Sequence, residues 1–211
     1  PNTLRLQPFT VHTQQGSISL KSSVKIGFQQ DDIVVKNENP DKTVLEMSGL
    51  KLGSILNDPA IGQVDGTVSL NELQVNGKEI LLNGGKGMIS SLQFHGHNYH
   101  GLTLESLEIE NNQASAQVSL DDQSAALNLK GTFSLEGKPT MKVEANILRF
   151  DGRDLGFPEI AEVKCKGGLS LDTDGSSWQK VHGAFHLNDF NLEKSGKKLD
   201  CSQLDLDFDV D

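Results

Sequence analysis

The sequence predicts an all-β protein built from an antiparallel sheet whose strands are bent and bulged. Apolar and polar residues alternate through much of the 211-residue chain, which is the period of strands with one apolar face. The 21 glycines and many Asn and Asp residues supply frequent turns. One apolar spacing also recurs along the chain, which indicates a repeated β architecture.

This recurring spacing places apolar residues at relative positions 0, 2, 5 and 7. It is clearest at residues 66–75 and 183–192, where a glycine precedes it and an Asn-acid pair fills the central gap. The four copies are Leu4, Leu6, Phe9 and Val11; Val68, Leu70, Leu73 and Val75; Leu102, Leu104, Leu107 and Ile109; and Phe185, Leu187, Phe190 and Leu192.

The spacing fits a strand with one extra residue better than it fits a helix. At about 100° per residue, the four positions lie on no single helical face. On a regular strand the first two and the last two positions point to opposite faces. A β-bulge in the gap brings all four to one face and bends the strand. A tight turn is the alternative, although no gap contains Asn-Gly or Asp-Gly.

The elements follow from the N-terminus. Strand-like alternation begins at residues 4–11, and residues 50–56 resemble a short helical turn that Pro59 ends. Residues 151–160 interrupt the later strands as a loop or a short helical turn. The predicted units are 1–44, the N-terminal strands of the sheet; 45–147, a β-repeat unit; and 148–211, a second, truncated β-repeat unit. Candidate turns after residue 66 lie at 76–77, 83–85, 96–98, 111–112, 121–122, 136–139, 172–175 and 194–196.

The shared apolar face allows two architectures. In an elongated, curled sheet it lines an open groove, and the bulges supply the curvature. In the alternative, a β-sandwich, the same face is a closed core.

The composition of the chain excludes some classes of function. The net charge of -10 argues against nucleic acid and against electrostatic docking on an anionic membrane. No apolar run approaches the length of about 18 residues needed for a transmembrane helix. The chain begins at Pro1 and ends directly after the alternating residues 204–210, so we expect a piece of a longer protein.

No catalytic or nucleotide-binding motif is present, so we expect a non-catalytic protein without a cofactor. His95, His97 and His100 form a weak metal candidate, because the cluster has imidazoles but no carboxylate or cysteine; an exposed loop is the alternative. Cys165 and Cys201 lie in strand-like runs. They form either a disulfide or two free thiols.

Residues 50–70, 145–156 and 168–200 together resemble the TamB-like branch of the AsmA-like superfamily, which are periplasmic β-repeat proteins of Gram-negative bacteria. The resemblance covers most of residues 45–211 and implies a taco-like sheet with an apolar inner face. It also implies an inner-membrane-anchored parent that spans the periplasm. Such a parent carries phospholipid between the membranes or assembles outer-membrane proteins with a BamA-type barrel partner. The family has no catalytic residues, and its partner-contacting region is not recognisable here.

The first functional prediction is therefore a groove for phospholipid acyl chains. The alternative is a cell-surface β-sandwich for binding or adhesion, with sealed apolar faces and binding loops. The groove candidates are Val68, Leu70, Leu73, Val75, Leu102, Leu104, Leu107, Ile109, Phe185, Leu187, Phe190 and Leu192.

Overall fold

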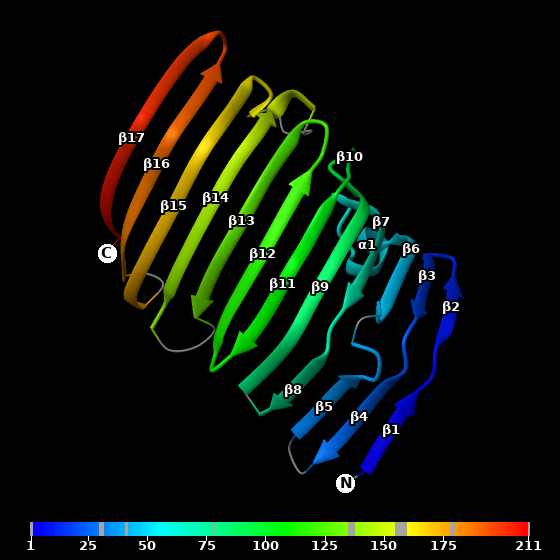
Figure 1. Ribbon diagram of the computed structural model, residues 1–211. Helices are drawn as coiled ribbons and strands as arrows, with labels where there is room; N and C mark the ends of the chain where they lie inside the picture. The colour runs from blue at the N-terminus through cyan, green and yellow to red at the C-terminus, as the bar shows by residue number, and fades with distance from the viewer. Residues whose placement is uncertain are drawn as a thin grey trace. The chain divides into compact units, whose positions relative to one another are not determined.

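The structure is a computed structural model that describes residues 2–29, 32–40, 42–77, 79–134, 138–154, 160–177 and 180–210. Residue contacts divide the chain into an N-terminal unit, 1–112, and a C-terminal unit, 113–211. Strands dominate both units (Figure 1), and every strand pairing within them is antiparallel. The predicted all-β, curled antiparallel architecture is confirmed. The predicted repeat units 1–44, 45–147 and 148–211 rest on sequence repetition and stay a prediction.

The N-terminal unit contains eleven strands and a short helix among its described residues. They are β1 (Asn2–Leu6), β2 (Phe9–Thr13), β3 (Gly16–Leu20), β4 (Val24–Gln29), β5 (Asp32–Asn37), β6 (Leu45–Lys51), α1 (Leu52–Leu56), β7 (Ile61–Ser69), β8 (Glu72–Asn76), β9 (Glu79–Phe94), β10 (His97–Tyr99) and β11 (Leu102–Glu110).

Several strands of this unit are short and lie end to end in pairs, like the two halves of an interrupted strand. β7 and β8 lie end to end along β9, and both pair with it. β6 and β5 continue the two halves outward, followed by β3 and β4 and then by β2 and β1. Pro8 lies in the gap between β1 and β2, where its missing N–H costs the ladder nothing.

A small core fills the interruption. Leu20, Val24 and Val44 are buried together, and Leu6, Ile26, Val35 and Leu70 pack against them. Beside this core, the buried Ser22 hydroxyl donates to Asn37 Oδ1 at 2.6 Å. Asn37 Nδ2 donates to the carbonyl of Lys42 at 3.2 Å. The polar groups exposed by the strand break are thus satisfied inside the unit.

The C-terminal unit is a meander of longer strands that pair in chain order. Its outer strands β12 and β17 do not pair with each other within the described residues, and Figure 1 shows the strands curving along their length. The elements are β12 (Gln113–Asp121), β13 (Ala125–Ser134), β14 (Thr140–Asp151), the 3-10 turn η1 (Gly152–Asp154), β15 (Val163–Ser177), β16 (Lys180–Lys194) and β17 (Lys197–Val210).

Bulges replace strand breaks in this unit. Between the pairs Gly168–Asn188 and Lys166–Asn191, β16 carries one more residue than β15. Asp189 lies within this bulge and has a φ of 48°. Opposite it, Gly167 has a φ of 137°, and a Cβ there would lie 2.6 Å from the Cα of Phe190. Only glycine fits at residue 167, so this residue fixes the bulge.

The predicted phase slip is present in all four copies, in two forms. In β11 and β16 it is a register shift inside a strand. In the first two copies it is a break, between β1 and β2 and between β7 and β8. The chain keeps its direction through each gap, because β7 and β8 are both antiparallel to β9 and the outer halves follow in matched pairs. The tight-turn alternative is therefore wrong.

Other expectations have mixed outcomes. The predicted helical turn is α1, which ends at Asn57 in the left-handed conformation. The turns predicted at 83–85 and 172–175 are wrong, because these residues continue β9 and β15 with partners on both sides. In the predicted interruption 151–160, η1 forms a short turn and residues 155–159 lie outside the described residues. The turn predicted at 136–139 also lies partly outside them. Within the described residues, no helix is long and apolar enough to cross a membrane.

Candidate functional site: the apolar faces

The C-terminal unit carries its apolar side chains on one face, in rows that cross five or six strands. Directly paired residues of antiparallel strands share a face, so the register defines each row. One row is Ala116, Gly131, Val143, Leu171, Phe185 and Leu206; the next is Val118, Leu129, Ala145, Leu169, Leu187 and Leu204. A third row further along contains Ala125, Phe150, Cys165, Leu192 and Leu199.

This face stays accessible to solvent. Leu129, on the second strand of its row, is 36% exposed, and Leu204 and Leu206, on the outer strand β17, are 37% and 49% exposed. In the described part of the unit, the buried apolar residues are Ala114, Ala125, Ala126, Pro139 and Leu187. A closed sandwich core would bury most of the leucines. We therefore describe this face as an open apolar surface, which is the geometry of a groove lining.

The N-terminal unit has a similar face that joins three copies of the repeated spacing. One row is Leu4, Ile26, Val35, Leu73, Leu82 and Ile109; another is Phe9, Leu20, Leu45, Val68, Gly87 and Leu104. The first two copies run in opposite directions, so the first position of one lies in the row of the third position of the other. The third copy runs parallel to the second, so Leu104 lies in the row of Val68 and Ile109 in the row of Leu73.

The structure gathers the groove candidates within each unit. Val68, Leu70, Leu73 and Val75 share the N-terminal face with Leu102, Leu104, Leu107 and Ile109, and Phe185, Leu187, Phe190 and Leu192 lie on the C-terminal face. Val68 is 37% exposed and Leu187 is 9% exposed. The other ten candidates are part-buried.

Sequence reasoning missed a further copy on β17. Leu199, Cys201, Leu204 and Leu206 repeat the spacing and pair with Leu192, Phe190, Leu187 and Phe185 of β16. The signal was in the sequence, but a cysteine at the second position and an acidic residue after each later leucine concealed it.

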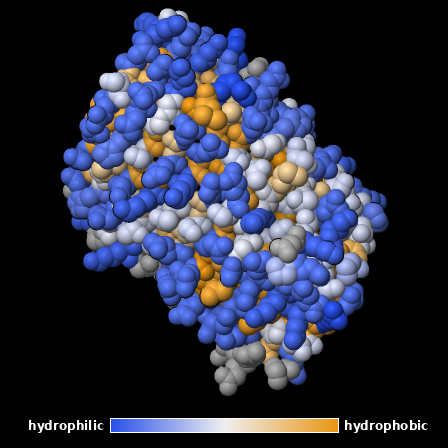
Figure 2. Space-filling model, in the orientation of Figure 1, coloured by the Kyte–Doolittle hydropathy of each residue, from blue (hydrophilic) through white to orange (hydrophobic). Residues whose placement is uncertain are grey.

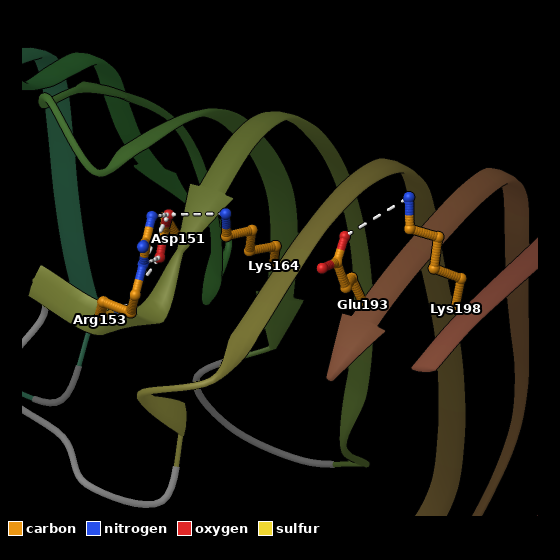
Figure 3. A network of polar contacts seen from close by, with 5 residues as sticks. All are labelled: Asp151, Arg153, Lys164, Glu193 and Lys198. Carbon is orange, nitrogen blue, oxygen red and sulfur yellow. Dashed lines mark hydrogen bonds and ion pairs between the residues drawn. The ribbon is translucent and has the colours of Figure 1, made fainter. Parts of the chain in front are cut away.

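The opposite face of the C-terminal unit is polar and carries cross-strand ion pairs. Figure 3 shows Asp151 between Arg153 and Lys164, and Glu193 beside Lys198. The hydrogen bonds from Arg153 hold the pKa of Asp151 well below its usual range. In the view of Figure 2, hydrophilic residues cover most of the visible surface and hydrophobic residues lie in patches between them.

Two further pairs join the polar sides of neighbouring strands. Lys142 Nζ lies 2.7 Å from Asp172 Oδ2, and this hydrogen bond raises the pKa of Lys142. His186 Nδ1 lies 2.6 Å from Asp205 Oδ1, and the contact lowers the pKa of Asp205. The members of each pair lie directly opposite each other on neighbouring strands, and such exposed pairs contribute little to stability.

The three histidines of the metal candidate have different local environments. His95 occupies the turn after β9 with a φ of 48°, whereas His97 begins β10. The ring of His97 packs against Tyr99, and His100 Nδ1 lies 3.1 Å from the carbonyl oxygen of Ser90. Among the residues that the structure describes, no three His, Cys, Asp or Glu side chains are grouped to hold a metal ion.

Cys165 and Cys201 are free thiols on the apolar face. Their strands, β15 and β17, are separated by β16, a spacing of about 10 Å between two strands that are not neighbours. A disulfide requires Cα atoms about 4.4–6.8 Å apart. The geometry therefore favours the free-thiol alternative, and burial raises the pKa of Cys165.

Comparisons with protein-family models, with curated proteins and with solved structures return no match to this chain.

Proposed function

We propose that the chain is a non-catalytic segment of a bacterial envelope protein whose apolar faces hold phospholipid acyl chains. The observation that carries this proposal is the set of apolar rows on one face of the C-terminal unit, with leucines that stay more than a third exposed. Large exposed apolar surfaces are uncommon in soluble proteins and mark binding sites.

The dimensions suit a flexible hydrocarbon chain. Six strands at about 4.8 Å spacing give rows of about 24 Å, and each buried CH₂ group contributes about 0.8 kcal/mol. Aliphatic side chains dominate the rows, and no charged residue lies in the two central ones. The polar face is then free to contact water.

The resemblance to TamB-like proteins is the basis for the proposed cellular location and role. On the basis of that resemblance, we propose that the parent protein lies in the periplasm, anchored in the inner membrane, with lipid transfer between the two membranes as its role. Assembly of outer-membrane proteins with a BamA-type barrel is the second use that the same surface supports, because an apolar strand of such a client would also fit the rows. A cell-surface adhesion module is less favoured, since it would require the apolar faces to be sealed.

Photo-crosslinking in cells tests the proposal. A photoreactive amino acid replaces Leu129, Leu187 or Leu204 on the apolar row. The matched controls are Asn128, Asn188 and Gln203, which neighbour them in the chain and lie on the polar row. We expect lipid adducts at the three leucine positions and far fewer at the controls. Adducts of protein mass would support the assembly role instead. No capture, or equal capture at both sets, would reject the acyl-chain surface.

A further inference from the structure

The polar face of the C-terminal unit contains a row of amide side chains. Asn128 on β13, Asn146 on β14 and Asn188 on β16 lie in one row with Gly168 of β15 between them. Asparagine is depleted in strand interiors, so these residues are poor choices for sheet stability. All three are exposed, and none makes a side-chain hydrogen bond to another described residue. Their donors and acceptors are therefore available to a ligand.

The amide row borders a hollow of about 460 Å³. Its polar lining is Gln117, Asn128, Lys130, Glu144, Asn146, Gly168, Ser170 and Asn188. Leu129, Ala145 and Leu169 complete the lining and lie between these residues along the strands. Since the polar members share one face of the sheet, the hollow opens on that face, away from the apolar rows.

Gly168 forms the floor of the hollow without any steric need for glycine. A Cβ at this position would meet only the carbonyl oxygen and Cβ of Asn188, at 3.6 and 3.7 Å, which are ordinary contacts. Its neighbour Gly167, in contrast, has no room for a Cβ. Glycine inside a strand weakens the sheet and often marks the close approach of a ligand. The absence of a side chain at Gly168 thus leaves room for a ligand in the hollow and is not required by the fold.

We propose that this hollow binds a neutral oligosaccharide. Primary amides donate and accept hydrogen bonds, as sugar hydroxyls do, and the Ser170 hydroxyl adds another such group. Lys130 and Glu144 balance each other, so the lining favours no net charge on the ligand. The strands repeat every 4.8 Å or so, and the row therefore offers hydrogen-bonding groups at regular intervals to a linear glycan. Among the described lining residues there is no aromatic ring, so recognition depends on hydrogen bonds and is weak.

The proposal is independent of the lipid surface, because the two sites lie on opposite faces of the same strands. Substitutions in the hollow are expected to leave lipid adducts at Leu187 unchanged. Loss of lipid capture would likewise leave glycan binding intact, so the two proposals fail separately.

The test is an NMR titration of the 211-residue protein with chitotetraose, cellotetraose and maltotetraose. We expect at least one of them to shift the side-chain amide signals of Asn128, Asn146 and Asn188, with Asn98 of the N-terminal unit as an unshifted reference. Gly168→Ala fills the floor of the hollow and should weaken binding about fivefold, as for one lost hydrogen bond, without lowering the thermal midpoint.

A second variant guards against misfolding. Asn146→Ala keeps the strand and should weaken binding by a similar factor, whereas Asn98→Ala should leave it unchanged. If none of the three oligosaccharides shifts the amide signals, or if Gly168→Ala and Asn146→Ala both bind as the wild type does, the glycan site is rejected.

Discussion

The two units accommodate the same apolar spacing in different ways. In the N-terminal unit two of the three copies break into half-strands, and the break is packed with Leu20, Val24 and Val44, while the third copy, in β11, continues through a bulge. In the C-terminal unit the strands continue through bulges, and the apolar residues remain spread over an open face. A break therefore creates a small core, whereas a bulge keeps the surface continuous and accessible.

The packed break and the open apolar face contribute differently to folding stability and to ligand binding. Burial around the break removes apolar side chains from water and stabilises the N-terminal unit. Away from the break, apolar residues of both units stay more than a third exposed, such as Phe9 in the N-terminal unit and Leu129 and Leu204 in the C-terminal unit, so these residues are available to a ligand at a cost in stability. Substitutions that are matched between the units can test this division.

The largest expected effect comes from the packed break. Leu20 is 6% exposed, and Leu20→Ala should lower the free energy of unfolding by about 3 kcal/mol, as for buried leucines in general. Leu204 is 37% exposed, and Leu204→Ala should cost about 1 kcal/mol or less because less surface leaves water on folding. Urea unfolding of both variants measures the contrast. Equal losses would mean that the C-terminal face is packed as tightly as the core.

The next effect concerns the bulge. Gly167→Ala forces a Cβ to within 2.6 Å of the Phe190 Cα at a φ of 137°, and should cost about 2 kcal/mol. Gly168→Ala should be neutral or stabilise by about 0.5 kcal/mol, since the position has room. Thermal unfolding of the two variants compares them directly. A destabilised Gly168→Ala would show that the strand itself needs this glycine.

A smaller loss is expected at the polar side of the break. Asn37→Ala removes the acceptor of the buried Ser22 hydroxyl and the donor to the Lys42 carbonyl. Leaving such groups unsatisfied should cost about 1–2 kcal/mol. Hydrogen exchange of β5 and β6 should rise in the variant and that of β15 should not. Asn146→Ala, which removes an exposed amide, serves as the control.

The smallest effect is the pH dependence of the β16–β17 pairing. The contact with His186 lowers the pKa of Asp205 from its ordinary value of 3.8. Its contribution to stability is therefore full above that value and is lost as the pH falls through the lowered pKa. We expect the urea midpoints of the wild type and Asp205→Asn to converge below pH 3.8. Asp207→Asn, opposite Ala184, should show no such convergence.

The sequence predicted the sheet well because its signals are local. Alternation and the 0, 2, 5, 7 spacing depend only on which face each residue takes, and the register confirms that the spacing keeps one face apolar. The turns predicted at 83–85 and 172–175 failed for a non-local reason. The backbone N–H of Gly84 donates to the Glu108 carboxylate at 3.0 Å, and Asp174 pairs with strands on both sides. These partners are distant in sequence, so no short pattern reveals them.

By itself, the sequence determined the all-β class, the apolar face and the phase slip, because the strand period and glycine or asparagine turns are encoded residue by residue. Only the tertiary structure decided whether a slip becomes a break or a bulge, since that depends on the neighbouring strand. It also decided how much of each apolar face is covered. Finally, it brought Asn128, Asn146 and Asn188 into one row, because strand register, rather than sequence distance, determines which side chains meet.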